Sequence, residues 1–265
     1  MGRRARLILM ALLGAVFLGS LIAVLAARHR YREEDRLYDL AAEEFLKETV
    51  QDASGRTTGE GVAEKKERIA PIEVDFDALL EACPDAVGWI YCEDTPINYP
   101  VVQGKDNGYY LRRSYTGTAS TAGSIFIDAS NRGDFTDSNT IVYGHHMKNG
   151  SMFACLDKWG EQEFYEAHPV MWLLTPGQDY EIVLFSGYTT AATSDTYRIF
   201  QGYGPELDEY LADCMAQSDF QADVDIDGKG RYVVLSTCAY VFADARHVLH
   251  GVLVPADSAG GVGIR

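Results

Sequence analysis

Two residues near the carboxyl end of the sequence have types and a spacing that suit acyl-transfer chemistry. Cys238 follows the apolar run 232–235, and Arg246 opens a second apolar run. A thiolate is a strong nucleophile, and a protonated guanidinium presents several N–H donors that can stabilise a thiolate or an oxyanion. If the two runs are neighbouring antiparallel strands, Cys238 and Arg246 lie opposite each other. The alternative is a buried cysteine and an unrelated surface arginine.

A nucleophilic cysteine also needs a proton acceptor, and the chain has 6 histidines. His145 follows the apolar run 141–143 and a glycine, where an expected strand gives way to a loop, which is a common position for catalytic groups. His146 is the second candidate for the base. Successive residues of an extended chain point in different directions, so we expect only one of the two to face the thiol. His247 and His250 alternate with core residues in the last run and are interpreted as surface or half-buried strand histidines.

A zinc site is a further possibility, with His145, His146 and Cys155 as ligands. Their spacing matches no standard zinc site, and adjacent histidines rarely converge on one ion. The 5 cysteines include no CxxC pair, so neither a zinc knuckle nor a thioredoxin motif is present. We therefore expect no metal and no cofactor.

The elements that must position these residues are mostly short strands. Runs typical of strands occur at 88–92, 97–102, 123–128, 139–144, 170–174 and 180–188, before the two runs described above. Helical patterns occur at 76–83, where Asp75 is a candidate N-cap, at 151–168 and at 205–218. Alternating βαβ spacing is absent. The pattern predicts a mostly β fold, a barrel or sandwich decorated by helices.

The N-terminal segment predicts a membrane anchor. Residues 7–27 are apolar and uncharged, and as a helix they span about 31 Å, enough for a bilayer core. A cleaved signal peptide has a shorter apolar core of roughly 7–15 residues, so cleavage near 24–26 is the alternative. Arginines flank both sides. We expect residues 1–6 in the cytoplasm, because a short tail before a large acidic domain suits a secretory signal-anchor.

The segment after the anchor changes character before the folded domain begins. Apolar residues recur at helical spacing within 33–50, and the following residues up to 68 are polar and without periodicity. We interpret 28–70 as a helical stalk and linker, with the alternative that the helix belongs to the domain itself. The catalytic domain is expected at 71–257 and a flexible tail at 258–265.

The composition excludes one class of partner. The chain of 265 residues is 47% hydrophobic and 23% charged, as is usual for a globular protein. Its net charge of −16 opposes binding to a phosphate backbone. We therefore expect no nucleic-acid partner.

Four separated segments resemble one known family. TIVYGHHMKNGSMFACL and VVLSTCAYVFADARHVLHGVLV are similar to the two signature segments of class B sortases, cysteine transpeptidases of Gram-positive cell surfaces. INYPVVQGKDNGYYL and GSIFIDASN resemble two further family segments. The four occur in the family's order within 72–256, after a single anchor. The resemblance implies a sortase-type β-barrel, closed or partly open, with decorating helices, preceded by a transmembrane helix and a helical stalk.

The resemblance also implies roles for particular residues. The family's catalytic histidine falls on His145, its nucleophile on Cys238 and its arginine on Arg246. The residues that it suggests for the sorting-signal groove are Asn107, Leu111, Thr193, Tyr197 and Ser236. The sequence departs from the family in two places. His146 stands where Asn or Arg is expected, and no acidic residue directly follows Cys238, so we assign no fourth catalytic carboxylate.

The family implies a reaction and a place for it. Cys238 attacks the carbonyl of a Thr in the C-terminal sorting motif of a secreted protein, and His145 protonates the departing amine while Arg246 holds substrate and oxyanion. A peptidoglycan amine then resolves the thioacyl intermediate. The expected location is the cell membrane, in a single pass through 7–27, with the catalytic domain on the extracellular face.

Three alternatives stay open at this point. A pilus-type sortase uses the same chemistry to polymerise subunits, but the lid segment and second membrane helix that usually accompany it are not evident. An L,D-transpeptidase also uses Cys and His, but its usual SHGCxR-type segment is missing. A membrane-tethered surface-binding module with an inert thiol belongs to a different class, and such a module would have no fast-reacting cysteine.

Overall fold

The computed structural model describes residues 2–49, 68–238 and 244–257, except for the side chains at 5, 6, 8, 9, 11 and 238. The chain divides into two compact units, Met1–Leu40 and Ala41–Arg265. The predicted tail 258–265 and most of the predicted linker lie outside the described residues.

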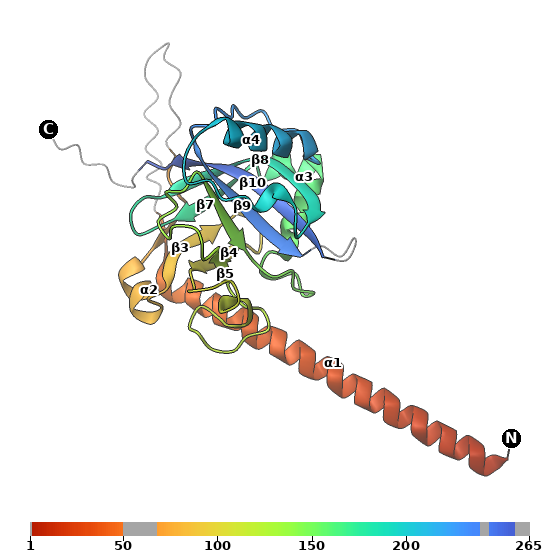
Figure 1. Ribbon diagram of the computed structural model, residues 1–265. Helices are drawn as coiled ribbons and strands as arrows, with labels where there is room; N and C mark the ends of the chain where they lie inside the picture. The colour runs from red at the N-terminus through yellow and green to blue at the C-terminus, as the bar shows by residue number, and fades with distance from the viewer. Residues whose placement is uncertain (1, 50–67, 239–243, 258–265) are drawn as a thin grey trace, which may run out of the picture. The chain divides into compact units, whose positions relative to one another are not determined.

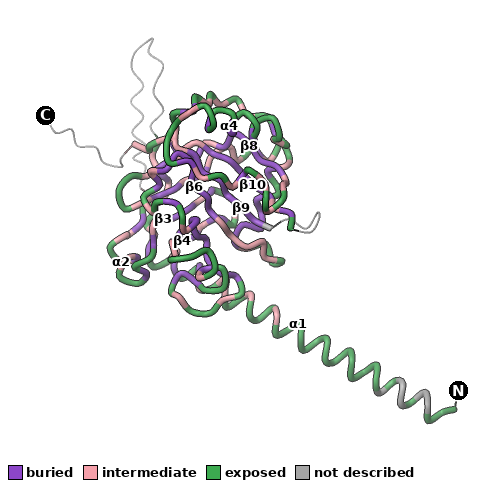
Figure 2. Tube along the Cα trace, in the orientation of Figure 1, coloured by how far each residue is buried: buried purple, intermediate pink, exposed green. Residues whose placement is uncertain are grey.

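The first unit is part of helix α1 (Arg3–Phe45), which continues without a break past the predicted anchor. From Leu12 onward this helix is long and apolar enough to cross a membrane, and the residues of its apolar stretch are exposed (Figure 2). By length and composition it is a candidate transmembrane segment, in agreement with the sequence.

The folded unit begins earlier in the chain than the sequence predicts. Ala41 and Phe45, near the end of α1, are fully buried. Directly after them β1 (Leu46–Glu48) pairs antiparallel with β2 (Ile72–Val74). These contacts favour the alternative in which the end of the helix belongs to the domain rather than to a stalk reaching residue 70. The sequence shows the apolar stripe of the helix but not what covers it.

Eight strands close into a mixed β-barrel in the order β10-β8-β7-β3-β4-β5-β6-β9 (Figure 1). Their bounds are β3 (Ala86–Tyr91), β4 (Asn98–Val102), β5 (Ile125–Ile127), β6 (Asn139–Tyr143), β7 (Val170–Leu174), β8 (Tyr180–Ala191), β9 (Arg231–Cys238) and β10 (Ala245–Pro255). The β4–β5 and β6–β9 pairs are parallel, and the other pairs are antiparallel. The structure confirms the predicted barrel in its closed form.

Short helices occupy the connections between the strands. They are α2 (Phe76–Ala82), η1 (Tyr110–Arg112), η2 (Ala154–Gly160), α3 (Gln162–Ala167), η3 (Asp195–Tyr197) and α4 (Pro205–Gln217), of which the three η elements are 3₁₀ helices. Asp75 caps α2 as predicted, because its carboxylate accepts a hydrogen bond from the Ala78 N–H at 3.1 Å.

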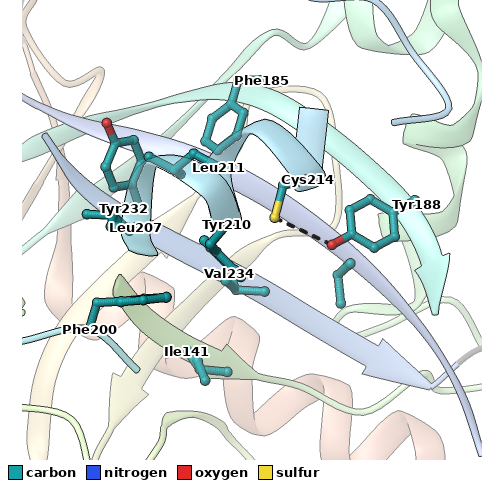
Figure 3. Close-up of a cluster of buried hydrophobic side chains, with 11 residues drawn as sticks. Ile141, Phe185, Tyr188, Phe200, Leu207, Tyr210, Leu211, Cys214, Tyr232 and Val234 are labelled. Carbon is teal, nitrogen blue, oxygen red and sulfur yellow. Dashed lines mark hydrogen bonds between the residues drawn. The ribbon is translucent and has the colours of Figure 1, made fainter. Parts of the chain in front are cut away.

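Helix α4 covers the outer face of the strands that lead to the predicted site. Its apolar side chains, among them Leu211 and Cys214, pack against Phe185 and Tyr188 of β8 and Val234 of β9 (Figure 3). The Tyr188 hydroxyl donates to the Cys214 sulfur at 3.5 Å. Full burial of such side chains contributes about 1.5–3 kcal/mol each. This layer therefore fixes β8 and β9 against each other through a shared cover.

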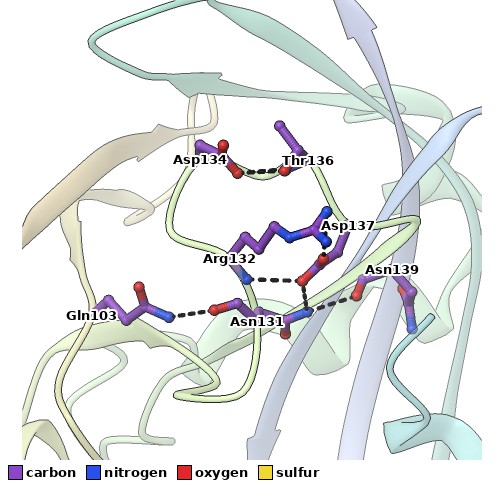
Figure 4. A network of polar contacts seen from close by, with 7 residues as sticks. All are labelled: Gln103, Asn131, Arg132, Asp134, Thr136, Asp137 and Asn139. Carbon is purple, nitrogen blue, oxygen red and sulfur yellow. Dashed lines mark hydrogen bonds and ion pairs between the residues drawn. The ribbon is translucent and has the colours of Figure 1, made fainter. Parts of the chain in front are cut away.

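A buried polar network holds the loop between β5 and β6 (Figure 4). The Asn131 side-chain amide donates to Asp137 and to the Asn139 carbonyl, both at 2.9 Å. The Arg132 backbone N–H donates to the same Asp137 oxygen at 2.8 Å, and Gln103 donates to the Asn131 carbonyl at 2.7 Å. Buried polar groups are stable only when bonded in this way. The network sets the start of β6, the strand that leads to His145.

Two histidines on β10 are buried in the folded barrel. His247 is 3% exposed and His250 is 1% exposed. Burial lowers the pKa of His247 to about 4 and that of His250 to about 3. The His250 ring stacks on Tyr188, with the ring centroids 5.3 Å apart. Burial disfavours the charged form of both rings, so protonating either one in the folded state costs stability.

We predict that the unfolding free energy falls as the pH drops below 6.5, the ordinary histidine pKa, towards about 4. In this window the unfolded chain binds protons that the folded chain does not, and each histidine contributes a slope of up to about 1.4 kcal/mol per pH unit. His250→Phe keeps a ring against Tyr188 and should remove roughly half of the histidine slope. Urea unfolding between pH 7 and pH 4 measures this, and equal slopes for the variant and the wild type would contradict it.

Candidate active site

Three neighbouring strands bring the predicted catalytic positions to one end of the barrel, with β9 between β6 and β10. β10 runs antiparallel to β9, and Arg246 lies opposite Cys238. β6 runs parallel to β9, and Tyr143 lies opposite Ser236. His145 lies two residues beyond Tyr143, the last paired residue of β6. The predicted antiparallel pairing of the last two strands is confirmed.

A pocket of about 350 Å³ opens at this end of the barrel. Its lining residues are Asn107, Leu111, Phe126, Tyr143, Gly144, His145, Ala192, Tyr197, Ser236, Thr237 and Arg246. Aromatic and apolar side chains with a few polar groups are typical of a site that binds an extended or small ligand. The pocket thus gathers residues from loops and strands that lie far apart in the sequence.

Six of the eight predicted site residues line this pocket: His145, Arg246, Asn107, Leu111, Tyr197 and Ser236. Thr193 is exposed and does not line it, whereas its neighbour Ala192 does. The backbone of Cys238 ends β9, but its side chain and residues 239–243 lie outside the described part of the chain. The individual roles of the eight residues stay predictions.

Sequence reasoning missed two aromatic residues of the pocket, Phe126 and Tyr143. Tyr143 precedes the glycine and histidine of the YGH motif, and this position is a signal that could have found it. Phe126 lies in the run IFI of a buried strand. Nothing in such a run distinguishes a pocket residue from a core residue.

The His145 ring is held by a backbone carbonyl. Its Nε2 lies 2.7 Å from the Leu111 oxygen. A carbonyl oxygen only accepts, so Nε2 carries the hydrogen, and Nδ1 is left to take up or release a proton. Gly123 makes this contact possible: a Cβ on it would lie 2.7 Å from the same oxygen and 3.0 Å from Cδ2 of His145.

Only one N–H donor of the Arg246 guanidinium is bonded among the described residues. Its Nη1 donates to the Ala245 carbonyl at 3.0 Å. Among the described residues no carboxylate forms an ion pair with it. A guanidinium has five N–H donors and stays charged. The remaining donors are therefore available to a carbonyl oxygen or an oxyanion in the pocket.

A hydroxyl pair lies beside the end of β9. The Tyr197 hydroxyl and the Ser236 Oγ are 2.9 Å apart, and either can donate. The Tyr197 ring stacks on Tyr143, with centroids 6.2 Å apart and planes 23° apart. Because Ser236 is 2% exposed, this bond satisfies a hydroxyl that would otherwise be buried without a partner.

The other four cysteines, Cys83, Cys92, Cys155 and Cys214, are free and buried. Burial raises the pKa of all four thiols, to about 12 for Cys92 and to about 11 for Cys155 and Cys214. A buried, protonated thiol is a poor nucleophile. These four cysteines are therefore structural. No group of three or more His, Cys, Asp or Glu side chains suited to a metal ion occurs in the described part of the chain.

Known proteins are similar to this chain in both sequence and fold, although no family model matches it. Sortase B of Listeria monocytogenes is 41% identical over 174 residues, which are 64% of this chain and 70% of that protein. The crystal structure of Bacillus anthracis sortase B in complex with AAEK1 has a TM-score of 0.69 at 32% identity and covers 86% of this chain and 99% of that one. The Staphylococcus aureus sortase B–substrate complex has a TM-score of 0.67 at 26% identity and covers 89% of this chain and 100% of that one.

The barrel is that of the sortases, which are cysteine transpeptidases, and the arrangement of its strands matches theirs over most of the chain. Given the identity to the Listeria protein and the share of it that is matched, this chain belongs to the sortase B family. A similar sortase B structure has been solved in complex with triglycine.

We predict that Gly123→Ala lowers the transpeptidase activity by more than about tenfold, because the added methyl displaces the carbonyl that holds His145. Gly123 has a φ of +59°, so part of any loss of stability, about 1–2 kcal/mol, is backbone strain. Gly117→Ala is a matched control, since its φ is +79° and its Cβ would meet only the Tyr109 hydroxyl, at 3.5 Å. Turnover of both variants, normalised to the folded fraction, measures the effect. Equal losses in the two variants would contradict it.

Proposed function

We propose that this enzyme cleaves a secreted protein after the Thr of a C-terminal sorting motif and joins the new carboxyl end to a peptidoglycan amine. The observation that carries the proposal is the strand pairing, in which Arg246 lies opposite Cys238 and the end of β6, just before His145, runs alongside β9. The resemblance of the sequence segments assigns the reaction roles to these same positions. The sortase B complexes with substrate and with triglycine support the two classes of reactant.

The first half-reaction forms a thioester. The Cys238 thiolate attacks the carbonyl carbon of the Thr, a C–S bond forms, and the negative charge moves to the carbonyl oxygen. The spare N–H donors of Arg246 stabilise that oxyanion. The C–N bond then breaks, and the departing amine takes a proton from Nδ1 of His145, while Nε2–H stays bonded to the Leu111 carbonyl.

The second half-reaction restores the thiolate. A peptidoglycan amine attacks the same carbonyl carbon and gives its proton to Nδ1 of His145. The C–S bond breaks, and an amide joins the two molecules. Asn107, Leu111, Tyr197 and Ser236 line the pocket and would hold the sorting motif during both steps. Thr193, exposed beside the pocket, would contact a longer peptide.

We place the barrel on the extracellular face of the cell membrane, with α1 as a single-pass anchor. The apolar helix supports the anchor. The proposed substrates, secreted proteins and peptidoglycan precursors, support the orientation, because both are found outside the cytoplasmic membrane.

The decisive test uses the full chain in detergent and quenched fluorogenic peptides with NPxTN-like, LPxTG-like and SPxTG-like motifs. We expect one motif to be cleaved, with the product shifting from acid to amide when an amine such as triglycine is added. Cys238→Ala should abolish turnover, and Arg246→Lys should reduce it by roughly 10- to 100-fold, because a point charge replaces a fork of donors. Cleavage that survives Cys238→Ala would refute the assigned nucleophile.

A thiol assay separates the enzyme from a binding module. We predict that a small alkylating reagent modifies Cys238 of the native protein at least about tenfold faster than the four buried cysteines, whose pKa values are raised. Denaturant should bring all five thiols to similar rates. With a membrane-impermeant reagent, modification of Cys238 in intact protoplasts reports an extracellular barrel. Absence of a fast-reacting thiol in the native protein would favour a binding module.

A further inference from the structure

One acidic side chain that the proposed chemistry does not use lies directly behind the pocket wall. Asp128 follows β5 and is 7% exposed. Its Oδ2 accepts hydrogen bonds from the Asn107 amide at 2.7 Å and from the Tyr143 hydroxyl at 3.0 Å. Its Oδ1 accepts from the Ser130 backbone N–H at 2.9 Å. The carboxylate thus joins two pocket-lining residues that come from different parts of the fold.

The bond to Asn107 fixes a loop whose residues 105–108 are exposed to solvent. Asn107 is exposed, and the loop before η1 carries it. Its amide donates to Asp128, and its side-chain oxygen accepts from the Ala129 N–H at 2.8 Å. Both ends of the amide are therefore held by the turn at Asp128. One N–H of the Asn107 amide remains for a substrate carbonyl, and its direction is set by these two bonds.

The bond to Tyr143 reaches the strand of the nucleophile. The Tyr143 ring packs on Phe126 of β5, with centroids 5.3 Å apart, and stacks on Tyr197. Tyr197 is hydrogen-bonded to Ser236, two residues before Cys238. The orientation of the Tyr143 ring therefore influences the position of the Tyr197 hydroxyl. Among the described residues, Asp128 is the only one whose side chain accepts a hydrogen bond from the Tyr143 hydroxyl.

We propose that Asp128 is a positioning residue that orients Asn107 and the Tyr143–Tyr197 wall for recognition of the sorting motif. The role rests on the proposed function, since the motif is the ligand that the pocket would hold. Asp128 does not line the pocket, so it acts through the residues that do. Its loss should weaken peptide binding and leave the reactivity of the thiol unchanged.

The test is Asp128→Asn in the full chain. An asparagine of the same shape cannot accept at both of its terminal atoms, so either the Ser130 N–H or the pair formed by Asn107 and Tyr143 loses its acceptor. Asp134→Asn is the matched control. Asp134 lies in the same loop, is exposed, and accepts at one carboxylate oxygen from Thr136 alone. Tyr143→Phe removes one of the two donors and leaves Asn107 bonded.

For Asp128→Asn we expect the KM for the cleaved peptide to rise about tenfold, because one charged hydrogen bond is lost. The kcat should stay within about twofold of the wild type. The rate of Cys238 alkylation should not change, Tyr143→Phe should give a smaller rise, and Asp134→Asn should give none. A loss of kcat at unchanged KM, or an equal effect of Asp134→Asn, would overturn the positioning role.

A readout that needs no substrate keeps the two proposals apart. In the wild type the side-chain amide resonance of Asn107 should exchange slowly with solvent, and in Asp128→Asn it should exchange at least about tenfold faster. If the wild type cleaves no peptide but the exchange rate rises in Asp128→Asn as stated, the proposed function fails. The claim that Asp128 holds the Asn107 amide is then still supported. If the exchange rate is unchanged in Asp128→Asn and also in Asp128→Ala, which has no side-chain acceptor at all, Asp128 does not hold Asn107 and the inference fails, whatever the peptides show.

Discussion

Closure of the barrel between β6, β9 and β10 is the constraint on which the site depends. A β-strand has only two edges, and β9 uses one for a parallel neighbour and the other for an antiparallel neighbour. A parallel neighbour places its C-terminal end beside that of β9, whereas an antiparallel neighbour places its N-terminal end there. His145 and Arg246 can therefore flank Cys238 although 93 and 101 residues separate the histidine from the other two (238 − 145 and 246 − 145).

A shift of one residue in either pairing would turn the side chains of β9 to the opposite face. The registers are held by packing remote from the pocket. Helix α4 covers β8 and β9 on the outside, and the Asp137 network sets the beginning of β6. The site residues themselves contribute little to this, since Arg246 bonds only its neighbour's carbonyl among the described residues. Such a division leaves the polar groups of the pocket available for ligand.

The sequence predicted much of this because local signals and the overall fold agree. The two apolar runs near the carboxyl end indicated neighbouring strands, which the structure pairs, and residue types indicated the cap at Asp75 and the helix at 205–218. The partners of buried polar groups were not visible. Nothing in the sequence tells that Asp128 meets Asn107, because loop geometry brings them together. The sequence predicted Thr193 as a pocket residue, whereas its neighbour Ala192 lines the pocket. The reason is the same, because loops carry no periodicity that fixes which residue points inward.

The end of α1 bears on how much of the chain a soluble form of the folded unit needs. Phe45 is 2% exposed, and β1 supplies the only partner strand that β2 has among the described residues. If a protease cut between residues 49 and 68 and the N-terminal fragment then dissociated, β2 would lose its partner strand and the apolar site of the Phe45 ring would be vacant. A cut before Ala41 would remove neither. A shed, soluble form that keeps its fold must therefore carry the last turn of the helix with it.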